Sequence, residues 1–175
     1  MALMANLDLA FEIECKEYLR EPWANSIDGH QLWQNIFSYW LSELERELLC
    51  QFHVETYSLG LKLVNDIQIG IINRTWRGID LSTDVLSFPM HECLIINPMK
   101  KTDLQKSISI ELGDIIISIE TAERQSIDHN HSLEHELHWL ASHGLLHLLG
   151  LDHPDQESLN RMLNYQDKLL SKTYN

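Results

Sequence analysis

The sequence predicts an α+β (mixed α/β) fold in which about four strands form one mixed sheet covered by about five helices. Two observations lead to this class. Apolar residues recur with the period of a strand in some segments and of a helix in others, and the two kinds of segment do not alternate strictly. The chain has 175 residues, 44% of them apolar and 22% charged. A single domain over residues 1–175 is therefore expected.

The first half of the chain is expected to supply two strands and two helices. Residues 7–15 alternate between apolar and polar side chains, as in a half-buried strand. Apolar residues three and four apart predict an amphipathic helix over 31–49, and alternating leucines predict a strand over 54–64. Residues 65–66 are suited to cap a further helix, which the sequence Arg-Gly-Ile-Asp at 77–80 interrupts.

The second half is expected to add two strands and two helices. Residues 85–88 are predicted to form a buried strand, and the aperiodic, lysine-containing segment 90–107 an exposed loop. Three consecutive isoleucines at 115–117 give the strongest indication of a buried strand. Helical periodicity follows over 132–149 and 155–170.

Charge and composition exclude several classes of protein. Thirteen Lys and Arg residues against 26 Asp and Glu give a net charge of −13, which disfavours a protein that coats nucleic acid through bulk positive charge. No apolar run reaches the ~18 residues of a membrane span, and residues 1–14 lack the basic residues of a signal peptide, so a cytoplasmic protein without membrane association is predicted. Cys15, Cys50 and Cys93 are odd in number and widely spaced, which favours buried free thiols.

Seven of the ten histidines fall within residues 129–153. His143 and His147 are four residues apart and would share one helix face, and Gly150 suits a left-handed helix end that lets the chain return and bring His153 to the same point. Three imidazole ligands leave one tetrahedral position open, which is the pattern of catalytic zinc. One Zn²⁺ per chain that activates water is therefore predicted.

The remaining histidines of this region lack a comparable convergent spacing. They are predicted to be solvated or hydrogen-bonded, and they are His129, His131, His135 and His138.

The spacing of the three proposed ligands is similar to that of metzincin proteases, but Gly144 stands where those enzymes have a general-base glutamate. A peptide hydrolase is therefore disfavoured. Residues 143–153, H-G-L-L-H-L-L-G-L-D-H, resemble much more closely the signature H-G-x-L-H-L-x-G-y-D-H of the YbeY family of rRNA maturation endoribonucleases. The one departure is Leu151, where that family has tyrosine.

Two further blocks carry the same resemblance. Residues 72–89 are similar to the family segment L-N-x-x-y-R-G-x-D-x-P-T-D-V-L-S-F-P, with Ile72 in place of leucine and Ser82 in place of proline. Residues 112–118 are similar to the family strand L-G-D-I-x-I-S. The blocks follow the family's order, and the resemblance covers roughly residues 54–170.

The resemblance implies that His143, His147 and His153 are catalytic zinc ligands and that Arg77 is a functional arginine beside the metal. An independent reason supports an arginine there, because a planar guanidinium can bind two oxygens of a phosphodiester. Arg74 is a weaker candidate for substrate binding. Thr83, Asp84 and Ser87 either shape the cleft or satisfy buried hydrogen bonds, and Asp114 either partners a histidine or caps the start of a strand.

The resemblance implies a zinc-dependent, single-strand-specific endoribonuclease that matures the 3′ end of small-subunit (16S) rRNA and takes part in ribosome quality control. The rRNA precursor and the small ribosomal subunit or its proteins are the implied partners. A local basic rim of Arg74, Arg77 and the lysines at 100, 101 and 106, or recruitment by ribosomal proteins, would reconcile RNA binding with the acidic charge.

Two other functions stay open: a metalloprotease-like hydrolase with a base from outside the motif, and a noncatalytic ribosome-assembly factor with structural zinc. The sequence leaves the general base open, since Asp152 could accept a proton or only orient His153. It also leaves open whether water or the RNA 2′-hydroxyl attacks.

Overall fold

The computed structural model describes residues 4–48, 54–91 and 108–173. Its helices and strands follow one another in an order that alternates between the two types only in part. They are β1 (Leu7–Ile13), the short 3₁₀ helix η1 (Lys16–Tyr18), α1 (Ser26–Glu47), β2 (Val54–Val64), α2 (Asp66–Arg77), β3 (Val85–Pro89), β4 (Ile108–Ser118), α3 (Ile119–Asp128), α4 (Leu133–Leu148) and α5 (Gln156–Thr173).

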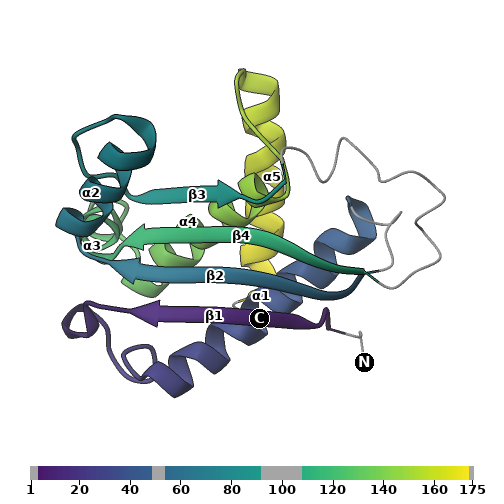
Figure 1. Ribbon diagram of the computed structural model, residues 1–175, viewed down its shortest axis with the longest axis horizontal. Coiled ribbons are helices and arrows are strands. Elements are labelled where there is room, and N and C mark those ends of the chain that lie inside the picture. Colours follow the sequence, from purple (N-terminus) through teal and green to yellow (C-terminus); the bar gives the residue numbers. More distant parts are fainter. Residues whose placement is uncertain (1–3, 49–53, 92–107, 174–175) are drawn as a thin grey trace.

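The four strands form one mixed sheet in the order β1-β2-β4-β3 (Figure 1). β1, β2 and β4 are parallel, and β3 pairs with β4 in antiparallel orientation at one edge. One face of the sheet packs against α1, α4 and α5 in the main core. On the other face, Ile69 and Ile72 of α2 pack against Leu86 of β3 and Ile116 of β4. The predicted mixed sheet covered by helices is confirmed.

Several element boundaries differ from the predicted ones. α1 begins at Ser26, five residues before the predicted start, because the Asn25 side chain accepts hydrogen bonds from the Ile27 and Asp28 N–H groups and caps it. The helix α3 was not predicted by periodicity. It follows β4 directly, is capped by Ser118, and buries only a few small or apolar residues, so its pattern is weak. Of the predicted loop 90–107, residues 92–107 lie outside the described residues.

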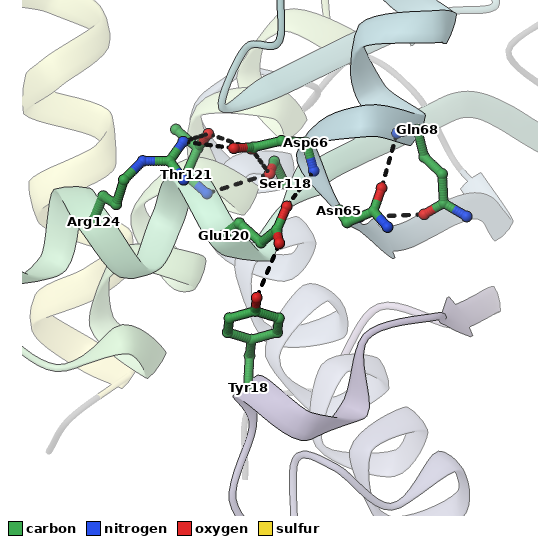
Figure 2. A network of polar contacts seen from close by, with 8 residues as sticks. All are labelled: Tyr18, Asn65, Asp66, Gln68, Ser118, Glu120, Thr121 and Arg124. Atoms are coloured by element: carbon green, nitrogen blue, oxygen red, sulfur yellow. Dashed lines mark hydrogen bonds and ion pairs between the residues drawn. The ribbon is translucent and has the colours of Figure 1, made fainter.

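A polar network joins the N-terminal ends of α2 and α3 (Figure 2). The Asp66 carboxylate accepts hydrogen bonds from Ser118, Thr121 and Arg124, and its own N–H donates to Glu120 Oε2 at 2.8 Å. Burial raises the pKa of Asp66, but these hydrogen bonds outweigh burial and hold the pKa below its ordinary value. The network therefore fixes where α2 starts, and with it the direction in which the far end of α2 extends.

Two smaller predictions can be compared with the structure. Cys15 is a buried free thiol, as expected, whereas Cys50 and Cys93 lie outside the described residues. No helix in the described part of the chain is long and apolar enough to cross a membrane.

Candidate metal centre

Helix α4 presents two histidines toward one point. Its start is fixed by Ser132, whose Oγ accepts a hydrogen bond from the His135 N–H. His143 and His147 lie one helical turn apart, with ring centroids 4.6 Å apart and their Nε2 atoms 3.1 Å apart. Two nitrogen donors thus converge as the four-residue spacing predicts.

A chain reversal after α4 adds the third histidine. Gly150 has a φ of 95°, in the left-handed region that favours glycine, and its N–H donates to the His147 carbonyl. The Leu151 N–H donates to the Leu146 carbonyl, which completes a Schellman-type helix end. The His153 ring then lies 5.4 Å from that of His143 and 5.2 Å from that of His147.

The donor atoms of the three histidines all lie within 4.8 Å of one another. This arrangement offers a cation three nitrogen ligands from one side, which is the donor set that zinc accepts while keeping a further position open.

A buried glutamine orients the first of these histidines. Gln166 of α5 is fully buried, and its Nε2 donates to the Trp139 carbonyl and to Ser142 Oγ. Its Oε1 is therefore the acceptor for His143 Nδ1–H at 3.2 Å. The proton on Nδ1 leaves the lone pair of His143 on Nε2, the atom that faces His147.

Sequence reasoning missed Gln166. A signal existed, because Gln166 is a polar residue four positions after Met162 in the buried stripe of α5.

The electrostatics of the site favour neutral imidazoles. Burial is the main reason that the pKa of His147 is lowered to about 4, and the neighbouring His143 and His153 act in the same direction. Burial also lowers the pKa of His143, although the hydrogen bond with Gln166 opposes it. Neutral imidazoles are the form that binds a metal ion, so the fold keeps these ligands ready at neutral pH.

The three histidines open on a cleft of about 560 Å³ between α4, β3 and the segment after α4. Arg77, the last residue of α2, lines the same cleft, as do Asp84 and Asp152. Asp84 accepts hydrogen bonds from the Val85 N–H and from Gln125 Nε2, and Asp152 accepts one from the His153 N–H. Both carboxylates therefore have positioning contacts as well as access to the cleft.

Gly144 of α4 packs tightly against side chains of β3 and β4. A Cβ atom there would lie 2.9 Å from Ile115 Cγ2 and 3.0 Å from Ser87 Oγ, closer than side-chain atoms normally approach. The position at which metzincins carry their general-base glutamate therefore has no room for a side chain in this fold. A general base could therefore come only from outside this motif.

Other predicted residues are distributed unevenly around the cleft. Thr83 and Ser87 line it, whereas Arg74 is not among its lining residues and lies 3.7 Å from Asp80 in an exposed ion pair. Asp114 neither partners a histidine nor caps a strand, because it lies in the middle of β4 with its carboxylate over Gly60 on the open face of the sheet.

Among the upstream histidines, His129 and His131 are hydrogen-bonded to Glu136, as the prediction allowed. Of the two alternatives predicted for His138, the structure excludes the solvated one, because this residue is buried and its ring packs against several tryptophans. These are Trp23, Trp33 and Trp40. The side chains of His129, His131 and Glu136 form a second group that could hold a metal ion, with donor atoms within 4.8 Å of one another.

Comparison with known proteins gives a consistent family. The family model described as endoribonuclease YbeY matches residues 21–174. A Synechococcus sp. (strain RCC307) protein named endoribonuclease YbeY is 47% identical over 142 residues, covering 81% of this chain and 84% of that protein. Its namesake from Synechococcus sp. (strain CC9902) is 43% identical, with 97% and 92% covered. A Thermotoga maritima solution structure matches in fold, with a TM-score of 0.52, 22% identity, and 94% and 91% covered.

Proposed function

The chain belongs to the YbeY endoribonuclease family, and we propose that it is a zinc-dependent, single-strand-specific endoribonuclease that matures the 3′ end of small-subunit (16S) rRNA. One observation carries the proposal: three histidine donors converge within 4.8 Å of one another in a cleft that Arg77 also lines. A metal ligand set and a phosphate-binding cation are two parts that metal-dependent phosphodiester hydrolysis uses.

In this proposal His143, His147 and His153 would hold one zinc ion per chain. The residues present fit zinc, because the donors are nitrogens and Gln166 already fixes the tautomer of His143 with Nε2 free. Bound zinc supplies a Lewis acid that lowers the pKa of a coordinated water and polarises the phosphate.

Arg77 would bind the scissile phosphate. Its guanidinium can donate to two of the equatorial oxygens, on which negative charge grows during hydrolysis. No ion pair within the described ranges 4–48, 54–91 and 108–173 involves Arg77. Its position at the end of α2 leaves the guanidinium directed to the cleft rather than to a carboxylate.

A carboxylate of the cleft would accept the proton that the nucleophile loses. Asp152 is adjacent to His153 and exposed, and one of its oxygens accepts a hydrogen bond from the His153 N–H. Asp84 is less suited to this role, because both of its oxygens already accept hydrogen bonds from Val85 and Gln125. We therefore assign the proton acceptor to Asp152.

The acidic net charge of the chain limits its affinity for free RNA. A chain with a net charge of −13 repels free RNA at long range, and Arg77 with Arg74 neutralises few phosphates. Naked single strands would therefore bind weakly with a shallow salt dependence. The small ribosomal subunit or its proteins would supply the missing affinity. Duplex RNA would resist, since its backbone cannot bend into a recessed cleft.

The test measures cleavage of three substrates by the zinc-loaded chain across a salt series: a single-stranded RNA, its duplex, and a small subunit that carries unprocessed 16S rRNA. We expect slow cleavage of the single strand, none of the duplex, and faster, site-specific cleavage on the subunit. Zinc binding without cleavage of any RNA would instead identify a noncatalytic assembly factor. Cleavage of a peptide library would identify a protease.

A further inference from the structure

Glu136, in the first half of α4, is a buried carboxylate whose neighbours are imidazoles. Its side chain is only 2% exposed. His129 Nδ1 lies 3.2 Å from Glu136 Oε2, and His131 Nε2 contacts the same oxygen. Over the part of the chain that the structure describes, no lysine or arginine forms an ion pair with Glu136. A buried carboxylate needs compensating positive charge, which here must come from the imidazoles or from a cation between them.

The backbone holds these three side chains together before any ligand binds. His129 caps the C-terminal end of α3, with its N–H donating to the Gln125 carbonyl. Asn130 then adopts a φ of 57°, a left-handed turn that asparagine tolerates, so His131 returns to the same side. The His131 N–H donates to the Ser126 carbonyl. The convergence therefore rests on a hydrogen-bonded turn rather than on flexible side chains alone.

The donor set indicates which cations would bind. Two imidazole nitrogens and one carboxylate oxygen lie within 4.8 Å of one another. Zinc and similar first-row divalent cations prefer such mixed nitrogen and oxygen ligands, whereas magnesium and calcium prefer oxygen alone. The His129 side chain is 58% exposed, so a cation can reach the group from solvent and complete its coordination with water.

We propose that His129, His131 and Glu136 form a second divalent metal site, of zinc-like selectivity, at the junction of α3 and α4. It shares no donor with the group at the other end of α4. Glu136 precedes His143 by seven residues, which places the two sites about 10 Å apart along the helix. The inference does not depend on RNA cleavage.

A cation at this site would link α3 to α4. α4 carries two of the three histidines of the cleft, and α3 carries Gln125, whose Nε2 donates to the cleft residue Asp84 at 3.0 Å. The second site would therefore act by stiffening the two helices that flank the cleft. Its expected effect is on stability rather than directly on the chemical step.

The experiment titrates metal-stripped full-length protein with Zn²⁺ and counts bound equivalents by calorimetry and elemental analysis. We expect two equivalents in the wild type and one in Glu136→Gln, which keeps the shape of the side chain but loses its charge. His147→Ala should also bind one equivalent, and the double variant none. His91→Gln, an exposed histidine outside both groups, is the matched control and should keep two.

Thermal unfolding gives a second readout. Zn²⁺ should raise the unfolding midpoint of His147→Ala but not that of the variant that also carries Glu136→Gln. His129→Gln replaces Glu136→Gln if the latter does not fold, because His129 is largely exposed. One equivalent in the wild type, or two in both Glu136→Gln and His129→Gln, would overturn the proposal and leave an ordinary histidine–carboxylate contact.

Discussion

A histidine group lies at each end of helix α4, and the two groups have different surroundings. At the C-terminal end, His143 and His147 meet His153 in a cleft of about 560 Å³ that Arg77 also lines. At the N-terminal end, two imidazoles meet the buried carboxylate of Glu136, and none of the three residues lines that cleft. The first group combines metal ligands with a cleft that can admit a substrate and an arginine that can bind an anion. The second group offers metal ligands alone.

This difference shows that histidine spacing by itself does not define a reactive site. A third histidine environment lies between the two groups, since His138 packs at ring-centroid distances of 5.2 Å from both Trp23 and Trp33. Histidines on α4 and in the turn before it thus lie in a cleft, beside a carboxylate and in an aromatic core. The surroundings of each imidazole, rather than its spacing in the sequence, therefore decide what it can bind.

The largest expected effect is on the rate of RNA cleavage, which should depend on the C-terminal group and not on the N-terminal one. His147→Ala removes the ligand between His143 and His153, so RNA cleavage should fall to the background rate and one zinc equivalent should be lost. His129→Gln should leave the cleavage rate within about twofold of the wild type at saturating zinc, because it lies outside the cleft. Equal loss of activity in both variants, measured with a fluorescent single-stranded RNA, would show that the two groups form one functional unit.

Arg77 supplies the second distinguishing feature of the cleft. Arg77→Glu should lower the cleavage rate about a hundredfold, which corresponds to about 3 kcal/mol of transition-state stabilisation. Zinc content and the unfolding midpoint should stay unchanged, because Arg77 is exposed and is placed at the substrate. Wild-type cleavage rates in this variant, or loss of its fold, would show that the assigned role is wrong.

His138 tests the packing environment through pH. Burial, with a smaller effect from His135, lowers its pKa to about 4, below the value of about 6.5 expected in the unfolded chain. The unfolded state therefore binds the proton more tightly, and stability present above about pH 6.5 is lost as pH falls toward about 4. Between about pH 7.5 and about pH 5 this loss amounts to about 2 kcal/mol.

The measurement is the free energy of unfolding of metal-free protein in urea at several pH values. His138→Phe should show a shallower loss of stability with falling pH than the wild type, since phenylalanine does not titrate. Identical pH dependence in both proteins would mean that other histidines account for the effect.

A smaller effect is expected from the residue that orients His143. Gln166→Met keeps the volume of the buried side chain but removes the acceptor for His143 Nδ1–H. Zinc affinity at the cleft should fall about tenfold, as for other partners that orient metal ligands. Competition with a chromophoric chelator measures this change, and affinity for the second equivalent at Glu136 should stay constant. A change confined to that second equivalent would contradict the assignment.

The smallest effect is expected at Arg74. Its ion pair with Asp80 is exposed, and such pairs contribute about 0–1 kcal/mol. Arg74→Gln should therefore change the free energy of unfolding by less than about 1 kcal/mol and the single-strand cleavage rate by less than about threefold. It is the matched control for Arg77→Glu. A hundredfold loss of cleavage would place Arg74 at the phosphate instead of, or together with, Arg77.

Patterns among adjacent residues explain the helices and strands that the sequence predicts correctly. The strand over 54–64 and the helix that begins after Asn65 and ends before Gly78 lie where they are predicted, because alternation and caps are encoded in adjacent residues. The helix α3 was missed because its buried face is short, with small residues such as Ala122 and Ser126. Its stability comes from packing on α4 and from the Asp66 network, which depend on contacts distant in sequence.

The sequence by itself determined the histidine geometry at the end of α4. Helical periodicity brings His143 and His147 together, and Gly150 reverses the chain toward His153, all within eleven residues. Only the tertiary structure decided the rest. Arg77 reaches the cleft through the packing of α2 on the sheet, and Gln166 orients His143 from α5. Such contacts join elements far apart in the chain, and no local period or cap specifies them.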